Sequence, residues 1–178
     1  GNADARVRLA EMAARGQGMA RNVEGAMEDL TRLSDQGEAA ASLSLADLYR
    51  GGQIVPVSLE KALRYFRQAA AQGSTTAEVR LGDLYAAGEG VAADSVLARD
   101  HYRQAAERGN VAAQVRLAEM QAKGEGTAQD IVAGTLALDA LATAGDAGAS
   151  LALGDLYGRA EGVPADPVPG DTRAGMAI

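Results

Sequence analysis

Apolar residues follow two periods along this chain, a short one typical of helices and a much longer one. Within a unit, an apolar residue is followed by others four and seven positions later, and this spacing indicates one buried face of a helix. The same face returns every 36 residues without an insertion or a deletion. Its three columns are Ala5, Ala41, Ala77, Ala113 and Ala149, then Leu9, Leu45, Leu81, Leu117 and Leu153, and then Met12, Leu48, Leu84, Met120 and Leu156.

Polar caps and glycines indicate where helices begin and end in each unit. The second half of a unit opens with a side chain that can accept a hydrogen bond from a free N–H group of a first helical turn. Glycines follow both halves, where the backbone often turns left-handed. The caps are Asn22, Ser58, Asp94, Asp130 and Asp166, and the boundary glycines are Gly1, Gly37, Gly73, Gly109 and Gly145. We therefore predict nine or ten helices in pairs, with unit boundaries within about two residues of these glycines and no strand longer than about three residues.

The predicted units form one domain and cover residues 1–36, 37–72, 73–108, 109–144 and, in part, 145–178. Each half of the unit also carries a column of small residues, which would let two helices approach closely. The columns are Ala10, Ala46, Gly82, Ala118 and Gly154 in the first half, and Ala26, Ala62, Ala98, Gly134 and Gly170 in the second half.

The strings LGDLYAAGEGVAAD (81–94) and HYRQAAERGNVAAQVRLAEM (101–120) resemble the Sel1-like repeat, a helix-turn-helix relative of the tetratricopeptide repeat. The resemblance covers essentially the whole chain, although unit one has Ala13 in place of the family tyrosine. That tyrosine is present at Tyr49, Tyr85 and Tyr157. The resemblance implies an all-α fold, namely a right-handed α-solenoid of 36-residue helix-turn-helix repeats. It also implies that the first helices line a concave surface and that the protein acts as an adaptor.

Composition narrows the possible partners. The hydrophobic fraction is 47% with only 3% aromatics, so the predicted core consists of alanine and leucine. A net charge of −7 disfavours nucleic acid, which needs a clustered basic surface. No uncharged apolar run approaches the roughly 20 residues of a membrane span, so direct membrane insertion is not expected. The absence of cysteine excludes disulfides, thiolate catalysis and thiolate metal sites.

The setting of the protein is less constrained. Because the chain opens directly on a repeat, we expect a domain cut from a longer protein, so that an export signal could lie outside it. The compartment stays open, with a periplasmic or secreted location favoured over a cytoplasmic one. Fifteen arginines stand against two lysines, Lys61 and Lys123, among abundant alanine and glycine, which is typical of a GC-rich bacterial genome.

Candidates for catalysis are few. The single histidine, His101, stands between Asp100 and Tyr102 and could be interpreted as an acid–base site. Its equivalents in the two preceding units are Tyr65 and Asp29, so a tolerated polar aromatic is the favoured interpretation. Metal binding would need more ligands than one histidine and scattered carboxylates. We therefore predict that the protein is not an enzyme and holds neither a cofactor nor a metal.

A polar arc on the first helix of each unit is the main candidate for binding. Positions 4, 8, 11 and 15 of the unit share one side of a helical wheel. Position 11 is always acidic and position 8 is arginine in three units, as shown by Glu11, Asp47, Asp83, Glu119 and Asp155 and by Arg8, Arg80 and Arg116. We predict that both sets face the concave groove, although a solvated face with i, i+3 ion pairs of about 0.2–0.5 kcal/mol each is the alternative. Position 6 is polar within an apolar arc and is expected at the other edge of the groove, with Arg6, Ser42, Glu78, Gln114 and Ser150.

The second helix of unit four, residues 130–145, is more apolar than its equivalents. One of its stripes holds Val132, Leu136, Ala140 and Thr143, where unit one has Glu24, Glu28, Arg32 and Asp35. An apolar stripe needs a cover, which could be the segment 167–178, missing sequence or a partner protein, or a second copy in a self-dimer. If Val132 and Leu136 are open to solvent, they become candidates for a contact site.

Two classes of function remain. The first is an interaction scaffold that presents a groove to another protein or peptide, the usual work of a solenoid. An alternative within this class is a periplasmic or envelope adaptor in exopolysaccharide secretion or its regulation, as the resemblance implies. The other class is a carbohydrate-binding or hydrolytic protein, which would need acids or aromatics clustered in one pocket. The repeats instead spread these residues evenly, which favours the scaffold.

Overall fold

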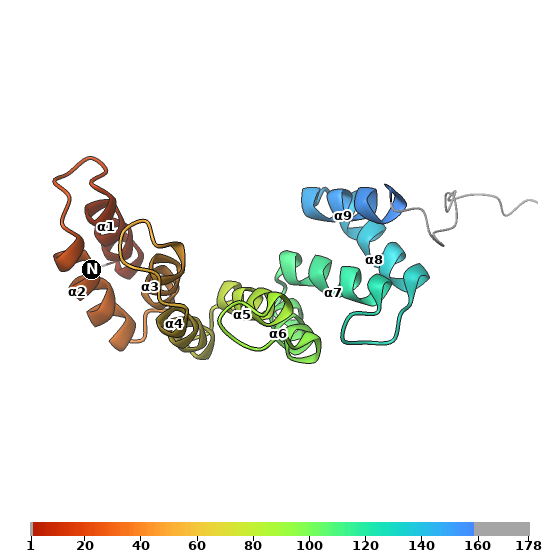
Figure 1. Ribbon diagram of the computed structural model, residues 1–178. Helices are drawn as coiled ribbons and strands as arrows, with labels where there is room; N and C mark the ends of the chain where they lie inside the picture. The colour runs from red at the N-terminus through yellow and green to blue at the C-terminus, as the bar shows by residue number, and fades with distance from the viewer. Residues whose placement is uncertain (1, 159–178) are drawn as a thin grey trace, which may run out of the picture.

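The computed structural model describes residues 2–158, and every regular element in this range is an α-helix (Figure 1). The helices are α1 (Ala3–Arg15), α2 (Val23–Asp35), α3 (Ala39–Gly51), α4 (Leu59–Ala71), α5 (Thr75–Ala87), α6 (Ser95–Glu107), α7 (Val111–Lys123), α8 (Ile131–Thr143) and α9 (Ala147–Gly158). The expected all-α architecture is confirmed. The boundary glycines Gly37, Gly73, Gly109 and Gly145 lie in the short links between repeats, each with a positive φ.

Local signals set the ends of these helices as expected. The second helices begin after Asn22, Ser58, Asp94 and Asp130, whose side chains accept backbone N–H groups of the first turn at 3.0, 3.4, 3.0 and 2.9 Å. These bonds satisfy donors that have no partner within the helix. The first helices end at left-handed glycines, namely Gly16, Gly52, Gly88 and Gly124.

The loop inside each repeat carries a further glycine for a reason that involves the preceding repeat. Gly90 and Gly126 both have a positive φ, of 74° and 66°. A Cβ atom on Gly90 would lie 2.7 Å from Leu59 at the start of α4, and one on Gly126 would lie 2.4 Å from the carbonyl oxygen of Ser95 at the start of α6. The recurring glycine-rich loop is therefore a packing element that lets each repeat contact the one before it.

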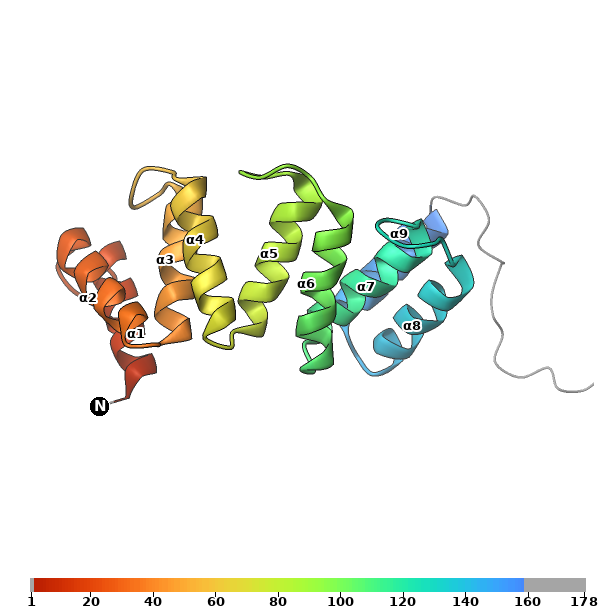
Figure 2. The ribbon, with the colours of Figure 1, turned by 90° about the horizontal axis from the view of Figure 1, so that it is seen from below.

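The helices stack into an arc (Figures 1 and 2). Extensive contacts join helices adjacent in sequence, and smaller contacts join α1 to α3 and α7 to α9. In Figure 1 the odd-numbered helices lie on the inner side of the arc and the even-numbered helices on its outer side. Figure 2 views the same row from the outer side. The first helix of every described repeat therefore contributes to one continuous inner surface.

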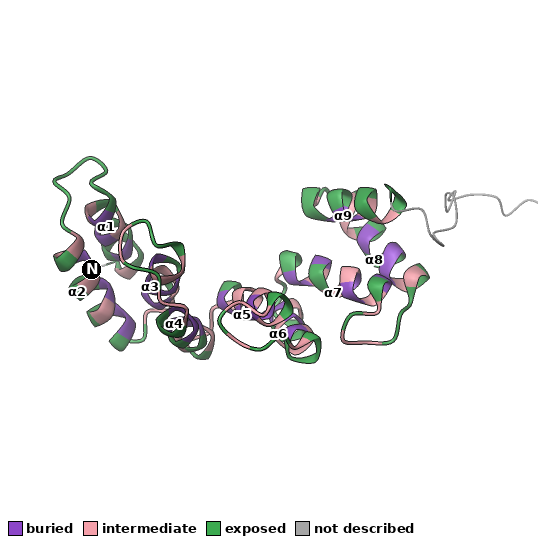
Figure 3. Ribbon diagram, in the orientation of Figure 1, coloured by how far each residue is buried: buried purple, intermediate pink, exposed green. Residues whose placement is uncertain are grey.

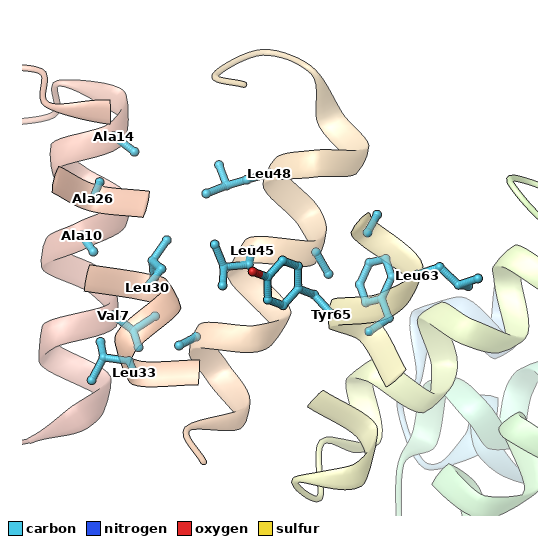
Figure 4. Packing of buried hydrophobic residues seen from close by; sticks show 14 of the residues in the cluster. Val7, Ala10, Ala14, Ala26, Leu30, Leu33, Leu45, Leu48, Leu63 and Tyr65 are labelled. Carbon is cyan, nitrogen blue, oxygen red and sulfur yellow. The ribbon is translucent and has the colours of Figure 1, made fainter. Parts of the chain in front are cut away.

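Buried residues follow the sides on which neighbouring helices face one another (Figure 3). In Figure 4, Leu45 and Leu48 of α3 point toward Leu30 and its neighbours in the first repeat. Leu45 is fully buried, and so is Leu30. The core is thus formed between consecutive repeats as well as within them.

The prediction that the apolar face of each first helix is buried is wrong for the first repeat, where Ala5, Leu9 and Met12 are all exposed. Leu9 is 54% exposed, whereas Leu45 and Leu81 are 0% and 1% exposed, and Leu117 and Leu153 are half-buried. The reason is that the later leucines pack toward a preceding repeat, and no described helix precedes α1. In α1 the buried residues are instead Val7, Ala10 and Ala14.

The small-residue columns allow close contacts at two glycines. A Cβ atom on Gly82 would lie 2.5–2.8 Å from the ring of Tyr102, and one on Gly134 would lie 2.6 Å from the carbonyl oxygen of Ala118. Tyr102 fills the position held by Leu30, Phe66 and Leu138 in the other repeats. Gly82 therefore provides the space for a buried tyrosine between α5 and α6.

We expect Gly82→Ala to lower the free energy of unfolding by about 1–2 kcal/mol. Overpacking against Tyr102 costs about 1–3 kcal/mol, and the better helix propensity of alanine recovers at most about 1 kcal/mol. The double variant Gly82→Ala/Tyr102→Leu should regain most of the loss, because the next repeat combines Ala118 with Leu138 in one buried cluster. Denaturant unfolding followed by circular dichroism measures these effects.

Gly154→Ala is the matched control for this test, since nothing lies within 4 Å of a Cβ atom there. It should raise the free energy of unfolding by about 0.5–1 kcal/mol through helix propensity alone. A Gly82→Ala protein as stable as the unchanged protein would contradict the packing argument.

Candidate interaction surface

The acid that recurs at position 11 contacts the next repeat at two junctions. Glu11 on α1 accepts a hydrogen bond from the Ser44 hydroxyl on α3. In the same way, Asp83 on α5 lies 3.6 Å from Nε of Arg116 on α7. Ser44 and Arg116 both occupy position 8 of the following repeat. Glu11 and Asp83 therefore connect α1 to α3 and α5 to α7.

The contacts of the position-11 acids agree only in part with the alternative interpretation, in which each acid pairs with the residue at position 8 of its own helix. Arg116 does pair with Glu119 in its own helix at 3.1 Å. No ion pair within 4.0 Å joins Arg8 to Glu11 or Arg80 to Asp83 among the described residues. Two of the five acids at position 11, Glu11 and Asp83, thus have a partner in the next repeat, which a single-helix pattern could not indicate.

The middle of the row is a network of four side chains. The Tyr102 hydroxyl, which comes from the outer helix α6, donates a hydrogen bond to Asp83 at 2.8 Å. Burial, together with the charge and hydrogen bond of Asp83, raises the pKa of the Tyr102 phenol. Desolvation favours the neutral form of Arg116, but the charges of Asp83 and Glu119 more than offset it and raise the pKa of the guanidinium. Tyr102 therefore stays a neutral donor, and Arg116 stays charged.

Asp47 occupies the corresponding place one repeat earlier. Although it is open to solvent, partial desolvation by its neighbours raises the pKa of its carboxyl above the usual value, and the nearby charges of Arg80 and Arg50 oppose this effect. Asp47 and Glu11 line a small cavity of 120 Å³ between α1 and α3, together with Arg15, Ser44, Leu48, Gly51, Gln53 and Ile54.

The last junction breaks the pattern. Position 8 of the fifth repeat is Ala152, which is 4% exposed and belongs to the same cluster as Val115. No arginine or serine is therefore available there to bind Glu119 from the next repeat. Asp155 is exposed and makes no ion pair with another residue in 2–158.

We expected position 6 to lie at the other edge of the groove. In at least two repeats it is buried instead. Ser42 is fully buried, and its hydroxyl lies 2.7 Å from that of Ser34 and donates to Gln72 at 2.6 Å. Glu78 is 8% exposed and lies 2.8 Å from Nδ1 of His101. The polar side chains at these positions have partners in the interior, supplied by neighbouring helices.

His101 has the same packing position as Tyr65 one repeat earlier. Its ring stacks on Tyr85 with centroids 5.5 Å apart, and Tyr65 stacks on Tyr49 at 5.9 Å. The pair of His101 and Glu78 fastens α6 to α5. This geometry agrees with the interpretation of His101 as a polar aromatic at a structural position.

The apolar stripe of α8 lies on the surface. Val132 and Leu136 are 58% and 54% exposed, whereas Leu138 is fully buried in the core. The helical register expected for the fourth repeat is therefore correct. The proposed cover formed by residues 167–178 lies outside the described residues.

Two general properties of the described residues bear on function. Within 2–158, no three histidine or acidic side chains gather in a way that could hold a metal ion. None of the helices in the same range has the length and apolar character needed to cross a membrane.

The fold and the polar row define a helical repeat protein made of stacked helix-turn-helix units. The family model of the Sel1 repeat matches residues 3–38, 37–74, 75–110, 111–134 and 147–168, and the chain therefore belongs to the Sel1 repeat family. Proteins of this family are generally non-catalytic scaffolds that bind other proteins. No curated protein matches the sequence.

Solved structures of bacterial proteins share this fold. A Sel1 repeat protein from Oxalobacter formigenes has a TM-score of 0.75 and 24% identity, over 88% of this chain and 64% of that one. The protective antigen c5321 of uropathogenic Escherichia coli has a TM-score of 0.75 and 26% identity, over 90% of this chain and 35% of that one. Cysteine rich protein B of Helicobacter pylori has a TM-score of 0.55 and 19% identity, over 73% of this chain and 93% of that one. The chain thus spans less than two thirds of the first two proteins.

We expect Asp83→Ala to lower the free energy of unfolding by about 1–3 kcal/mol, because it leaves the hydroxyl of buried Tyr102 without its acceptor. Removing that hydroxyl as well, in Asp83→Ala/Tyr102→Phe, should cost less than the sum of the two single changes. Chemical denaturation of the four proteins of this cycle gives the coupling. Asp155→Ala is the control and should change stability by less than about 0.5 kcal/mol. Additive single changes would show that the network has no energetic coupling.

Proposed function

We propose that this chain binds a peptide or a loop of a partner protein in the groove along the inner side of its arc. The observation that carries the proposal is the polar row of positions 8 and 11, in which side chains of consecutive first helices are held against one another. Cavities lie beside this row at both ends, one between α1 and α3 and one between α7 and α9. A preformed surface loses little conformational freedom when a partner binds, and such a surface is the usual binding site of a solenoid.

Several members of the row are available to a partner. Arg8 and Asp155 are exposed, and neither makes an ion pair with another described residue. Exposed ion pairs contribute little to stability, so the recurrence of charge along the groove is better explained by recognition. The charges of Glu11, Asp47, Arg80 and Asp83 would then set the orientation of the bound segment.

The stripe on α8 is a second surface for contact. Val132 and Leu136 are exposed on the outer helix, apart from the groove. Large apolar side chains on a surface are typical of interaction sites. We propose that this stripe binds part of the same assembly.

Affinity capture from the source organism, followed by quantitative mass spectrometry, tests the groove. The groove variant combines Arg8→Glu, Asp47→Lys and Asp155→Lys. The control variant makes the same kinds of charge reversal outside both the groove and the α8 stripe, at Arg21→Glu, Glu28→Lys and Glu60→Lys; all six residues are exposed. We expect the unchanged protein and the control to retain the same partners, and the groove variant to lose them by at least about tenfold, since opposed like charges are costly at an interface. Equal capture by all three proteins would rule out the groove as the binding surface.

A further inference from the structure

The groove is not uniform along its length, and its section between α7 and α9 has a distinct chemistry. This section encloses about 370 Å³, and the lining residues that bear on its chemistry are Arg116, Glu119, Asp146, Leu151, Ala152 and Asp155. Three of these residues are acidic and one is basic.

The single basic residue of this section is already neutralised. Arg116 lies 3.6 Å from Asp83 and 3.1 Å from Glu119. Asp146 caps α9 by accepting the N–H group of Ala149 at 2.8 Å and makes no ion pair with another residue in 2–158. Asp155 has no cationic partner within 2–158, and Lys123, which is one turn further along α7 than Glu119, does not line the groove. The section therefore has an excess of negative charge.

An apolar side chain accompanies this charge. Leu151 is 69% exposed, although the equivalent residues Val7 and Val115 are 4% and 7% exposed in their repeats. Lysine and arginine place their aliphatic stems on apolar surface while their charged ends reach a polar group. Leu151 could contact the aliphatic stem of such a side chain, while Asp155 beside it could bind the charged end.

The opposite end of the groove lacks this character. Between α1 and α3 the acids Glu11 and Asp47 share their cavity with Arg15, and that cavity is only 120 Å³. At the last junction, position 8 of the fifth repeat is Ala152, so Glu119 has no partner from that repeat and pairs with Arg116 in its own helix. Asp155 would need position 8 of a following repeat, and residues 2–158 contain none.

We propose that the section between α7 and α9 binds a lysine or arginine side chain of a partner segment, with an adjacent apolar side chain packed on Leu151. This inference rests on the proposed function and assigns the partner segment a charge and an orientation. Residues 159–178 of the same chain suit the section less well, because they contain two arginines against three acidic residues.

A random 12-residue peptide library displayed on phage, selected on the immobilised 178-residue chain, tests this chemistry. The selected peptides should be enriched in a lysine or arginine next to a leucine, phenylalanine or tyrosine. A synthetic copy of the most enriched peptide should bind at least about tenfold more weakly to Asp155→Lys, and its binding should weaken with added salt. Asp139→Lys, an equal charge reversal on the outer helix, should leave binding unchanged.

The outcomes separate this inference from the proposed function. If peptides bind but show no basic enrichment, or lose affinity with Asp47→Lys and not with Asp155→Lys, the groove binds segments and the inference is overturned. If no peptide is selected at all, the proposed function fails together with it.

Cysteine labelling identifies the occupant, because the chain contains no cysteine of its own. The bound peptide should slow maleimide labelling of a Leu151→Cys variant at least about tenfold and leave a Leu136→Cys variant unaffected, as expected for direct cover of a buried contact. Slow labelling of Leu151→Cys in the free monomer would show that residues 159–178 fill the section. If labelling is slow only at concentrations where sedimentation detects a dimer, the cover over Leu151 is a second copy of the chain. Either result would overturn the proposal.

Discussion

The structure depends on apolar faces that no single repeat can bury by itself. Leu45 and Leu9 occupy the same column, yet Leu45 is fully buried and Leu9 is 54% exposed. The difference is that a described repeat precedes α3 and none of the described residues forms one before α1, and burying a leucine contributes about 1.5–3 kcal/mol. Stability is therefore shared between neighbours, as in other solenoids. The same dependence keeps the first helices in register along one inner surface.

Glycine and other small residues determine how closely these neighbours approach. Gly82 provides the space for Tyr102, and Gly134 brings α8 against the backbone of α7. Gly90 and Gly126 let the loop of one repeat touch the second helix of the repeat before it. These contacts fix the stacking geometry and hence the spacing of the polar residues on the inner side of the arc.

The polar row combines a structural and a binding role. Asp83, Tyr102 and Arg116 hold three helices together, so they contribute mainly to the rigidity of the groove. Where the column departs from its pattern, as at Ala152, Glu119 has no partner from the next repeat and pairs within its own helix. In a repeat protein, positions that recur in every unit generally serve stacking. A position that departs from the pattern is therefore a better indicator of a binding role.

The sequence by itself determined the family, the all-α fold, the repeat length and the ends of the helices. These features depend on local chemistry, because a cap such as Asp94 or a left-handed glycine such as Gly88 acts within one turn of its helix. Strict periodicity then makes each unit a check on the others. The register of α8 could be predicted for the same reason.

Only the tertiary structure decided which polar residues are buried and which residues pair between repeats. Ser42 and Glu78 are polar residues within an apolar arc, and their partners Ser34 and His101 belong to other helices. Asp83 pairs with a residue 33 positions away rather than with Arg80 in its own helix. Such contacts are set by the distance and angle between packed helices. A pattern read along one helix contains neither quantity, and for this reason the sequence could place the charges on a face but could not assign their partners.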